Sequence, residues 1–366
     1  MVRIPLPVWL YAAAVTSVQI GGTWDISWHL SIGRDEFLTP PHLLVYLCGV
    51  LAGLASAILV FGRSMPGVRV LGFTAPLGAF LAAWGGGAML VSAPFDDWWH
   101  NAYGLDVKVL SPPHVALLLG ALGVELGALL VILGALNRSE DERQRKTLQW
   151  IFLWAGTILV RSMAGSMIEL MSRNLLHTAR YYLVWSIIMG LGVATVATAS
   201  RHRWGGTIVT SLLMTLALVS LWILPLFPAA PKLGPVFQPV THFIPPAGFP
   251  ALLIVPGVLL DLVRRRANGQ HWRTALLAGP VMLAAFLAVQ WPFADFLQSP
   301  VARNPFFGAH YFPYFLHPDS DIARYVHTQI ETSGQFWARL GLAAFCSVMF
   351  LRLGLGLGNW MRLVRR

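Results

Sequence analysis

Charged residues are scarce in this chain. Asp, Glu, Lys and Arg make up 11% of its 366 residues, whereas hydrophobic residues make up 56%. A soluble globular domain carries about 25% charged residues, so this composition excludes an ordinary soluble protein. Cysteine is scarce as well. The two cysteines, Cys48 and Cys346, both lie inside apolar segments, which excludes a disulfide framework and favours small apolar packing residues.

In place of charge, the sequence has repeated apolar runs close to 20 residues long, the length that crosses a bilayer as a helix. It therefore predicts an all-α, polytopic integral membrane helix bundle with about ten transmembrane helices. The eighth run is the shortest, and it can lengthen backwards through residues 245–249. The expected spans are 6–28, 41–62, 69–92, 111–136, 148–171, 177–199, 205–226, 249–264, 274–294 and 335–357.

The net charge of +10 follows the expected topology. Arginine and lysine gather after the second, fourth, sixth and eighth spans and at the end of the chain, which places them on one side. The positive-inside rule makes that side cytoplasmic and puts both termini there. We therefore expect an inner or plasma membrane protein whose cations also attract anionic lipid. The bilayer is the expected partner, and a nucleic-acid partner is not expected.

The chain divides into three parts. Residues 1–136 hold four expected helices, residues 137–147 form a charged cytoplasmic linker, and residues 148–366 hold about six further helices with long aromatic loops. Loops of such length are usually functional or disordered. They contain His242, His310 and His317, which are either ordinary loop histidines, the preferred interpretation, or a lid and extra ligands over a site.

A duplicated motif is the most specific signal. Residues 25–42 read DISWHLSIGRDEFLTPPH, and residues 96–114 read DDWWHNAYGLDVKVLSPPH. Each copy has an acid, a Trp-His pair that ends four residues later, a Gly-x-Asp and a Pro-Pro-His. Two sets of equivalent side chains result: Asp25, His29 and His42 in the first set, and Asp96, His100 and His114 in the second set.

Helix geometry lets each set converge. An acid and a histidine at i and i+4 share one helix face, and prolines suit the first turn of the next helix. Two imidazoles with one carboxylate are a ligand set for copper, zinc or iron. The alternative is that these acids and histidines are ordinary polar groups at the water-exposed membrane interface. The presence of two copies at almost the same spacing disfavours that alternative. A haem held by His42 and His114 is less favoured, because it leaves the acids without a role.

Other polar residues surround these sets. Asp35 and Asp106 are placed to orient ligand histidines from a second layer. Arg34 is a further neighbour, or it pairs with Asp35 on the surface. Glu169 lies eight residues after Arg161; a structural pair between them is preferred over a role for Glu169 at a metal or on a proton path.

The first copy resembles the C subunit of the copper membrane monooxygenases, the family of particulate methane monooxygenase and ammonia monooxygenase. That subunit has an Asp-x-x-x-His helix end and an Arg-Asp-x-x-x-Thr-Pro-x-His segment, which here is Arg34 to His42. The resemblance implies copper ligands at Asp25, His29 and His42, and a nearby second site at Asp96, His100 and His114. The family has Asn where this chain has Asp96, which makes the second site more anionic.

The resemblance covers roughly residues 20–120 and implies a copper-dependent oxidoreductase that acts on a small, poorly soluble substrate at an extracytoplasmic metal site. It also implies partner membrane subunits, and a homo-oligomer is an open alternative. The first set is then the expected principal site. Two other hypotheses remain: a non-enzymatic protein that binds, delivers or transports copper or zinc, and an assembly subunit with degenerate sites.

Overall fold

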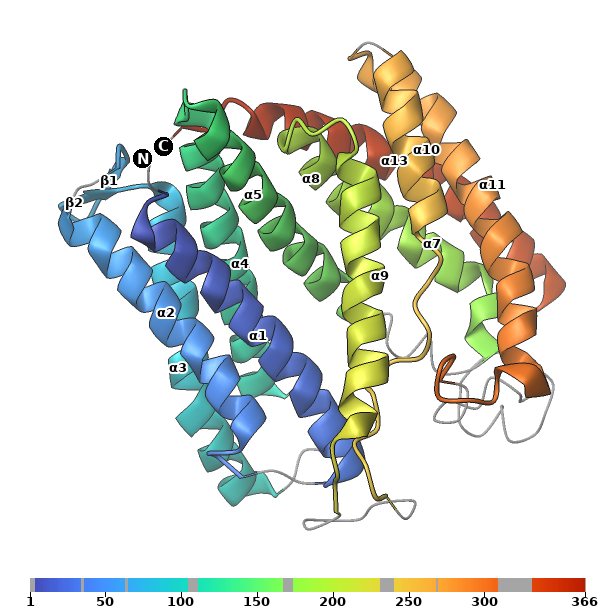
Figure 1. Cartoon of the computed structure of the whole chain (residues 1–366), viewed down its shortest axis with the longest axis horizontal. Helices are drawn as coiled ribbons and strands as arrows, with labels where there is room; N and C mark the ends of the chain where they lie inside the picture. The colour runs from blue at the N-terminus through green and yellow to red at the C-terminus, as the bar shows by residue number, and fades with distance from the viewer. Residues whose placement is uncertain are drawn as a thin grey trace. The chain divides into compact units, whose positions relative to one another are not determined.

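The computed structural model describes residues 4–33, 36–62, 65–104, 111–166, 174–230, 240–267, 269–308 and 331–365. Over these residues the regular structure is nearly all helical (Figure 1). The α-helices are α1 (Leu6–Ser31), α2 (Pro40–Gly62), α3 (Leu77–Tyr103), α4 (Pro112–Arg138), α5 (Glu142–Met163), α7 (Ala179–Ile187), α8 (Ala194–Ala199), α9 (Gly205–Ile223), α10 (Ile254–Arg266), α11 (His271–Gln298) and α13 (Ser333–Met361).

Short elements complete the description. A π-helical turn, Ile188–Val193, joins α7 to α8, and 3₁₀ turns lie at Ala164–Ser166, Asn174–His177, Leu224–Leu226 and Pro300–Ala302. Two strands, β1 (Val68–Val70) and β2 (Phe73–Ala75), pair antiparallel. The chain forms two compact units. The first contains α1 to α4, the β-hairpin, most of α5 and the chain end from Arg362, and the second contains the helices from α7 to α13.

Seven helical segments of the described residues are long and apolar enough to cross a membrane: Pro40–Gly62, Leu77–Tyr103, Pro112–Arg138, Ala179–Ala199, Gly205–Leu226, His271–Gln298 and Ser333–Met361. They support the prediction of a nearly all-α membrane protein. The expectation of about ten spans is reached only in part. Helix α1 has 26 residues, but polar side chains such as Gln19 and Asp25 make it less apolar. Helix α5 opens with a charged turn, and its expected span reaches beyond the described residues.

The eighth expected span differs most. Helix α10 has 13 residues, or about 20 Å at 1.5 Å per residue, against a hydrocarbon core of about 30 Å. The expected lengthening backwards through residues 245–249 is wrong, because the helix begins only at Ile254. Pro245, Pro246 and Pro250 explain this, since proline lacks an N–H and disfavours helix in the residue before it.

The third expected span begins too early. Residues 68–75 form the β-hairpin, and α3 starts at Leu77 and continues to Tyr103. Leu71 and Gly72 both have positive φ, 48° and 87°, as a two-residue hairpin turn of the favoured hand requires. Apolar composition alone does not distinguish such a hairpin from the start of a helix.

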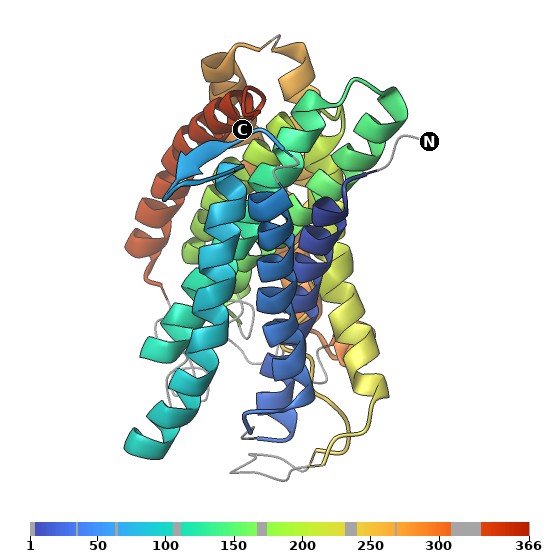
Figure 2. The same cartoon turned by 90° about the vertical axis from the view of Figure 1, so that its left-hand side faces the viewer.

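In the first unit, α1 to α4 run up and down beside one another (Figure 2). Small residues hold α3 against α4. A Cβ added at Gly85 would lie 2.5 Å from the Gly120 carbonyl oxygen, and one at Gly127 would lie 2.5 Å from the Gly78 oxygen. Close backbone contact of this kind is typical of helices in membranes. Because the helices alternate in direction, α1 and α3 end where α2 and α4 begin, so both Asp/His sets lie at one end of this unit.

In the second unit, a buried carboxylate ties α10 to the start of α9. Asp261 is fully buried and accepts hydrogen bonds from the backbone N–H groups of Gly206 (3.1 Å) and Thr207 (2.7 Å). It also pairs with Arg264 at 3.1 Å. The first N–H groups of a helix have no partner within the helix, so this carboxylate serves as a cap supplied by another helix.

Candidate metal centre

The second set is built by the end of α3 and the start of α4. Asp96 and His100 lie four residues apart in the last two turns of α3, on one face. His114 is the third residue of α4, which begins at Pro112 as the sequence predicts. Ser111 is the N-cap, and its side-chain oxygen accepts a hydrogen bond from the backbone N–H of His114 at 3.5 Å. The Ser-Pro-Pro-His sequence therefore fixes His114 in the first turn.

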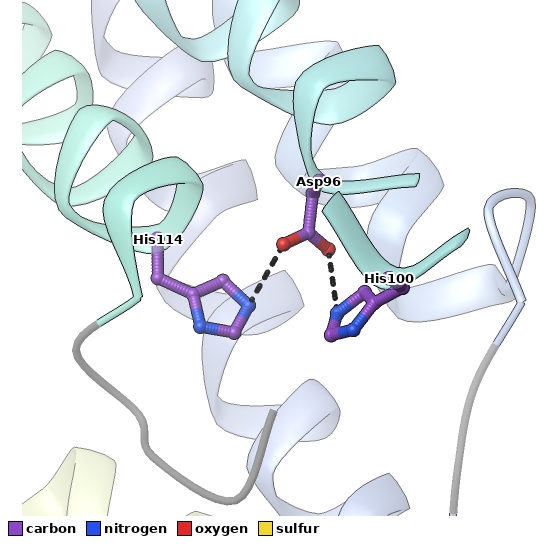
Figure 3. Close-up of side chains that lie close together, drawn as sticks. All are labelled: Asp96, His100 and His114. Atoms are coloured by element: carbon purple, nitrogen blue, oxygen red, sulfur yellow. Dashed lines mark ion pairs between the residues drawn. The ribbon is translucent and has the colours of Figure 1, made fainter. Parts of the chain in front are cut away.

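Asp96 lies between the two histidines and offers one oxygen to each (Figure 3). Its Oδ2 is 3.4 Å from His100 Nε2, and its Oδ1 is 3.5 Å from His114 Nε2. One ligand atom from each of the three residues lies within 4.8 Å of the other two. The side chains are 24 to 33% exposed, so the site is partly shielded and still open to water.

The His100 ring is oriented by the backbone. Its Nδ1 lies 3.3 Å from the carbonyl oxygen of Gly104, which can only accept, so Nδ1 is the donor in that contact and Nε2 faces Asp96. Gly104 ends α3 with φ of +81°, a conformation that favours glycine. A histidine fixed through its other nitrogen in this way is the usual arrangement of a metal ligand.

The first set repeats this plan in a more open form. Asp25 Oδ1 lies 3.3 Å from His42 Nε2, whereas Asp25 Oδ2 lies 3.8 Å from His29 Nε2. The side chain of His29 is 48% exposed. Among the described residues, the second set is the one group of three whose ligand atoms all meet within 4.8 Å, so the first set is not brought together as closely.

The likeness of the copies extends beyond the ligands. His42 Nδ1 lies 3.3 Å from the carbonyl oxygen of Phe37, so this ring also presents Nε2 toward its aspartate. Gly33 follows His29 by four residues and has φ of +94°, just as Gly104 follows His100. Helix α2 begins at Pro40, as α4 begins at Pro112. The duplicated sequence therefore produces a duplicated local structure.

Of the remaining predicted site residues, the structure describes only His242. Six of them lie outside the described residues: Arg34, Asp35, Asp106, Glu169, His310 and His317. His242 belongs to the second unit, where it forms a β-bridge with Pro228, and its Nδ1 lies 3.0 Å from Thr241 Oγ1. Its predicted alternative role as a lid or extra ligand stays a prediction.

Two polar features were missed or undervalued from sequence. Glu125, in the middle of α4, is 2% exposed. The sequence signal that could have identified it is a single acidic residue within a long apolar run.

The second feature is in the second unit. His177 Nε2 lies 2.9 Å from Asp295 Oδ1, and Gln298 Nε2 lies 3.0 Å from His177 Nδ1. Burial lowers the pKa of His177, and the Asp295 carboxylate opposes that effect. Both ring nitrogens of His177 therefore have polar neighbours within the second unit.

No family model, no curated protein and no solved structure matches the chain.

Proposed function

We propose that this chain is a membrane protein that binds a transition-metal ion between Asp96, His100 and His114. The convergence of two imidazole nitrogens and a carboxylate oxygen within 4.8 Å of one another carries the proposal. Ligand atoms bound at about 2.1 Å in tetrahedral geometry lie about 3.4 Å apart. The Asp96 oxygens already lie 3.4 and 3.5 Å from the two histidine nitrogens, so small side-chain movements would complete the site.

Three protein ligands leave a coordination position for water or another small molecule, which is typical of catalytic rather than structural sites. We propose copper as the ion, because two imidazoles with one carboxylate suit it and because the first copy resembles the ligand segment of the copper membrane monooxygenases. Bound copper would supply one-electron and dioxygen chemistry. The finer proposal is an oxidoreductase that acts on a small, poorly soluble substrate.

A non-enzymatic role in copper or zinc delivery is the second candidate. The side chains of His100 and His114 are 26 and 33% exposed, and an ion held by partly exposed ligands exchanges more readily than one enclosed in a core. Turnover separates the two candidates. Oxygen consumption by the copper-loaded protein with a small apolar substrate and a chemical reductant supports the enzyme, whereas metal transfer to a chelating acceptor without oxygen consumption supports delivery.

Metal analysis tests the site itself. The protein would be purified in detergent, loaded with Cu(II), freed of excess metal by dialysis and assayed for bound copper. We expect wild type and His271→Ala, a control in the second unit, to retain the same amount, and His100→Ala and His114→Ala to lose the ion held by the second set. Equal copper in all four proteins would reject the site. Electron paramagnetic resonance should show nitrogen ligands in wild type that weaken in His100→Ala.

The first set is proposed as a second, weaker site. The resemblance favours Asp25, His29 and His42 as the principal site, whereas the distances favour the second set. In the first set, His29 Nε2 lies 3.8 Å from Asp25 Oδ2, and the half-exposed ring would have to move closer for all three residues to bind one ion. His29→Ala should therefore remove less tightly held metal than His100→Ala does.

A further inference from the structure

The connection between α8 and α9 lies at one end of the second unit, beside the end of α10 (Figure 1). It consists of residues 200–204 and joins Ala179–Ala199 to Gly205–Leu226, two segments long and apolar enough to cross a membrane. Five residues reach at most about 18 Å when fully extended, so the connection stays close to the ends of both segments. When these segments cross the bilayer, the connection lies at the depth of the lipid headgroups.

Two arginines in the last turn of α10 hold this connection in place. Arg264 donates a hydrogen bond to the carbonyl oxygen of His202 at 2.8 Å. Arg265 donates two hydrogen bonds to the carbonyl oxygen of Arg203, at 2.9 and 3.1 Å, and its guanidinium carbon lies 3.5 Å from the centre of the Trp204 ring. The backbone that carries the outer side chains is therefore ordered by contacts within the protein, which lowers the cost of binding a ligand there.

Positive charge exceeds negative charge at this end of the second unit. Among the described residues of that unit the acids are Asp261, Asp295 and Glu331. Asp295 lies near the end of α11 and Glu331 beside the start of α7, both at the opposite end. Asp261 lies at this end, but it is buried and pairs with Arg264 at 3.1 Å. The exposed arginines here are Arg201, Arg203, Arg265, Arg266 and Arg273.

The first turns of α11 combine this charge with an apolar surface. Arg273, Leu277 and Val281 follow one another at four-residue spacing, so they share one face of the helix, and all three are exposed. Trp272, the second residue of α11, is 52% exposed, as is typical of tryptophan at the membrane–water interface. A cation at the helix start with apolar side chains below it matches a molecule that has an anionic head and hydrocarbon chains.

We propose that the five exposed arginines form a binding site for the phosphate headgroup of an anionic phospholipid. Guanidinium groups bind phosphate through paired hydrogen bonds, and basic groups at the cytoplasmic ends of spanning helices attract anionic lipid. The acyl chains of that lipid lie along the exposed face of α11 at Leu277 and Val281. This site takes no part in the proposed metal chemistry, so its test is independent of the metal analysis.

Lipid titration of the full chain tests this proposal. The protein is purified in a nonionic detergent, freed of lipid and titrated with phosphatidylglycerol, and native mass spectrometry gives the dissociation constant of the first lipid bound. Phosphatidylcholine and inorganic phosphate are titrated in parallel. We expect phosphatidylglycerol to bind at least about tenfold more tightly than either, because it combines a net negative charge with acyl chains.

A pair of double variants separates a built site from the net charge of the chain. Arg203→Gln with Arg266→Gln should raise the dissociation constant for phosphatidylglycerol at least about tenfold, since each cation near a membrane surface contributes about a fivefold gain in affinity. Arg143→Gln with Arg145→Gln is the control. It also removes two exposed arginines, but from the start of α5, where Glu142 is a close acidic neighbour, and it should change the constant by less than about twofold.

Three results would overturn the proposal. Equal weakening in both double variants means that net charge alone attracts the lipid. Phosphatidylcholine that binds as tightly as phosphatidylglycerol means that the headgroup charge is not recognised, and inorganic phosphate that binds as tightly means that the site takes a free anion. Should the Arg203 and Arg266 double variant fail to fold, Arg273→Gln replaces it and should raise the constant about fivefold. An unchanged constant in folded Arg273→Gln would then reject the site.

Discussion

Asp96 and His114 approach to 3.5 Å although they belong to different helices. Asp96 lies near the end of α3 and His114 near the start of α4, so their separation depends on how closely these helices pack. That packing is set by glycines whose Cα atoms face the backbone of the other helix, Gly85 against Gly120 and Gly127 against Gly78. The scaffold and the candidate metal centre are therefore linked.

Gly85→Ala should lower stability and weaken metal retention together. The new Cβ would lie 2.5 Å from the Gly120 carbonyl oxygen and 2.6 Å from the Val124 backbone nitrogen, so the helices must move apart. Overpacking of this kind costs about 1–3 kcal/mol. Gly87→Ala is the matched control on the same helix, because no atom lies within 4 Å of its added Cβ. Unfolding titrations in mixed micelles compare the two, and equal midpoints would contradict this account of the packing.

Much of the candidate metal centre could be predicted from the duplicated sequence motif. The i, i+4 spacing of Asp96 and His100 predicts a shared helix face, and Pro112-Pro113 predicts the helix start that positions His114. The structure has both features. The sequence could not rank the two sets, because the 3.8 Å gap between Asp25 and His29 depends on how a half-exposed ring turns at a helix end rather than on residue spacing.

The sequence predicted the helices well where apolar runs are long. It predicted them less well where single residues, such as a turn glycine or a proline, decide the local backbone conformation. Helices such as α4 and α11 follow their apolar runs within a few residues, since burial of the backbone in lipid requires helix. The β-hairpin at residues 68–75 depends on the positive φ values of Leu71 and Gly72, and the short α10 depends on prolines before it. Hydropathy averages over such single residues and does not detect them.

Asp96→Asn should weaken metal binding without disturbing the helices. Asparagine keeps the shape of the side chain and one carbonyl oxygen, but it removes the charge that faces both histidines at 3.4 and 3.5 Å. We expect at least about a tenfold rise in the dissociation constant of this site for Cu(II), or about 1.4 kcal/mol. Competition with a chelator of known affinity measures it. Asp25→Asn serves as the comparison and should leave the tighter site unchanged; if it weakens that site instead, the first set is the principal one.

Asp261→Asn should strongly destabilise the second unit. The carboxylate accepts from two backbone N–H groups and the Thr207 hydroxyl, and it neutralises Arg264. An amide cannot replace all of these acceptors and leaves the guanidinium without its charge partner. Removing one member of a buried pair costs about 3–5 kcal/mol. Arg266→Gln, at an exposed position of the same helix, should change stability by less than about 0.5 kcal/mol. Thermal unfolding of wild type and both variants in the same detergent tests this prediction. Similar losses of stability in the two variants would reject the role of Asp261.

His177 should make stability depend on pH near neutrality. Burial lowers its pKa in the folded protein below the value of about 6.5 expected for an unfolded chain. Above about pH 7.5 the ring is neutral in both states and contributes no pH dependence. As pH falls through 6.5, the unfolded chain binds the proton first, so folding loses free energy by at most about 1.4 kcal/mol per pH unit until pH reaches the folded pKa.

The difference between wild type and His177→Gln isolates this effect, because all other titrating groups are common to both proteins. The free energy of unfolding of wild type, relative to that of the variant, should be constant between pH 7.5 and 8.5 and should decrease from pH 7 to pH 5. An increase over the same interval would mean that attraction to the Asp295 carboxylate, 2.9 Å from Nε2, outweighs burial and raises the pKa instead.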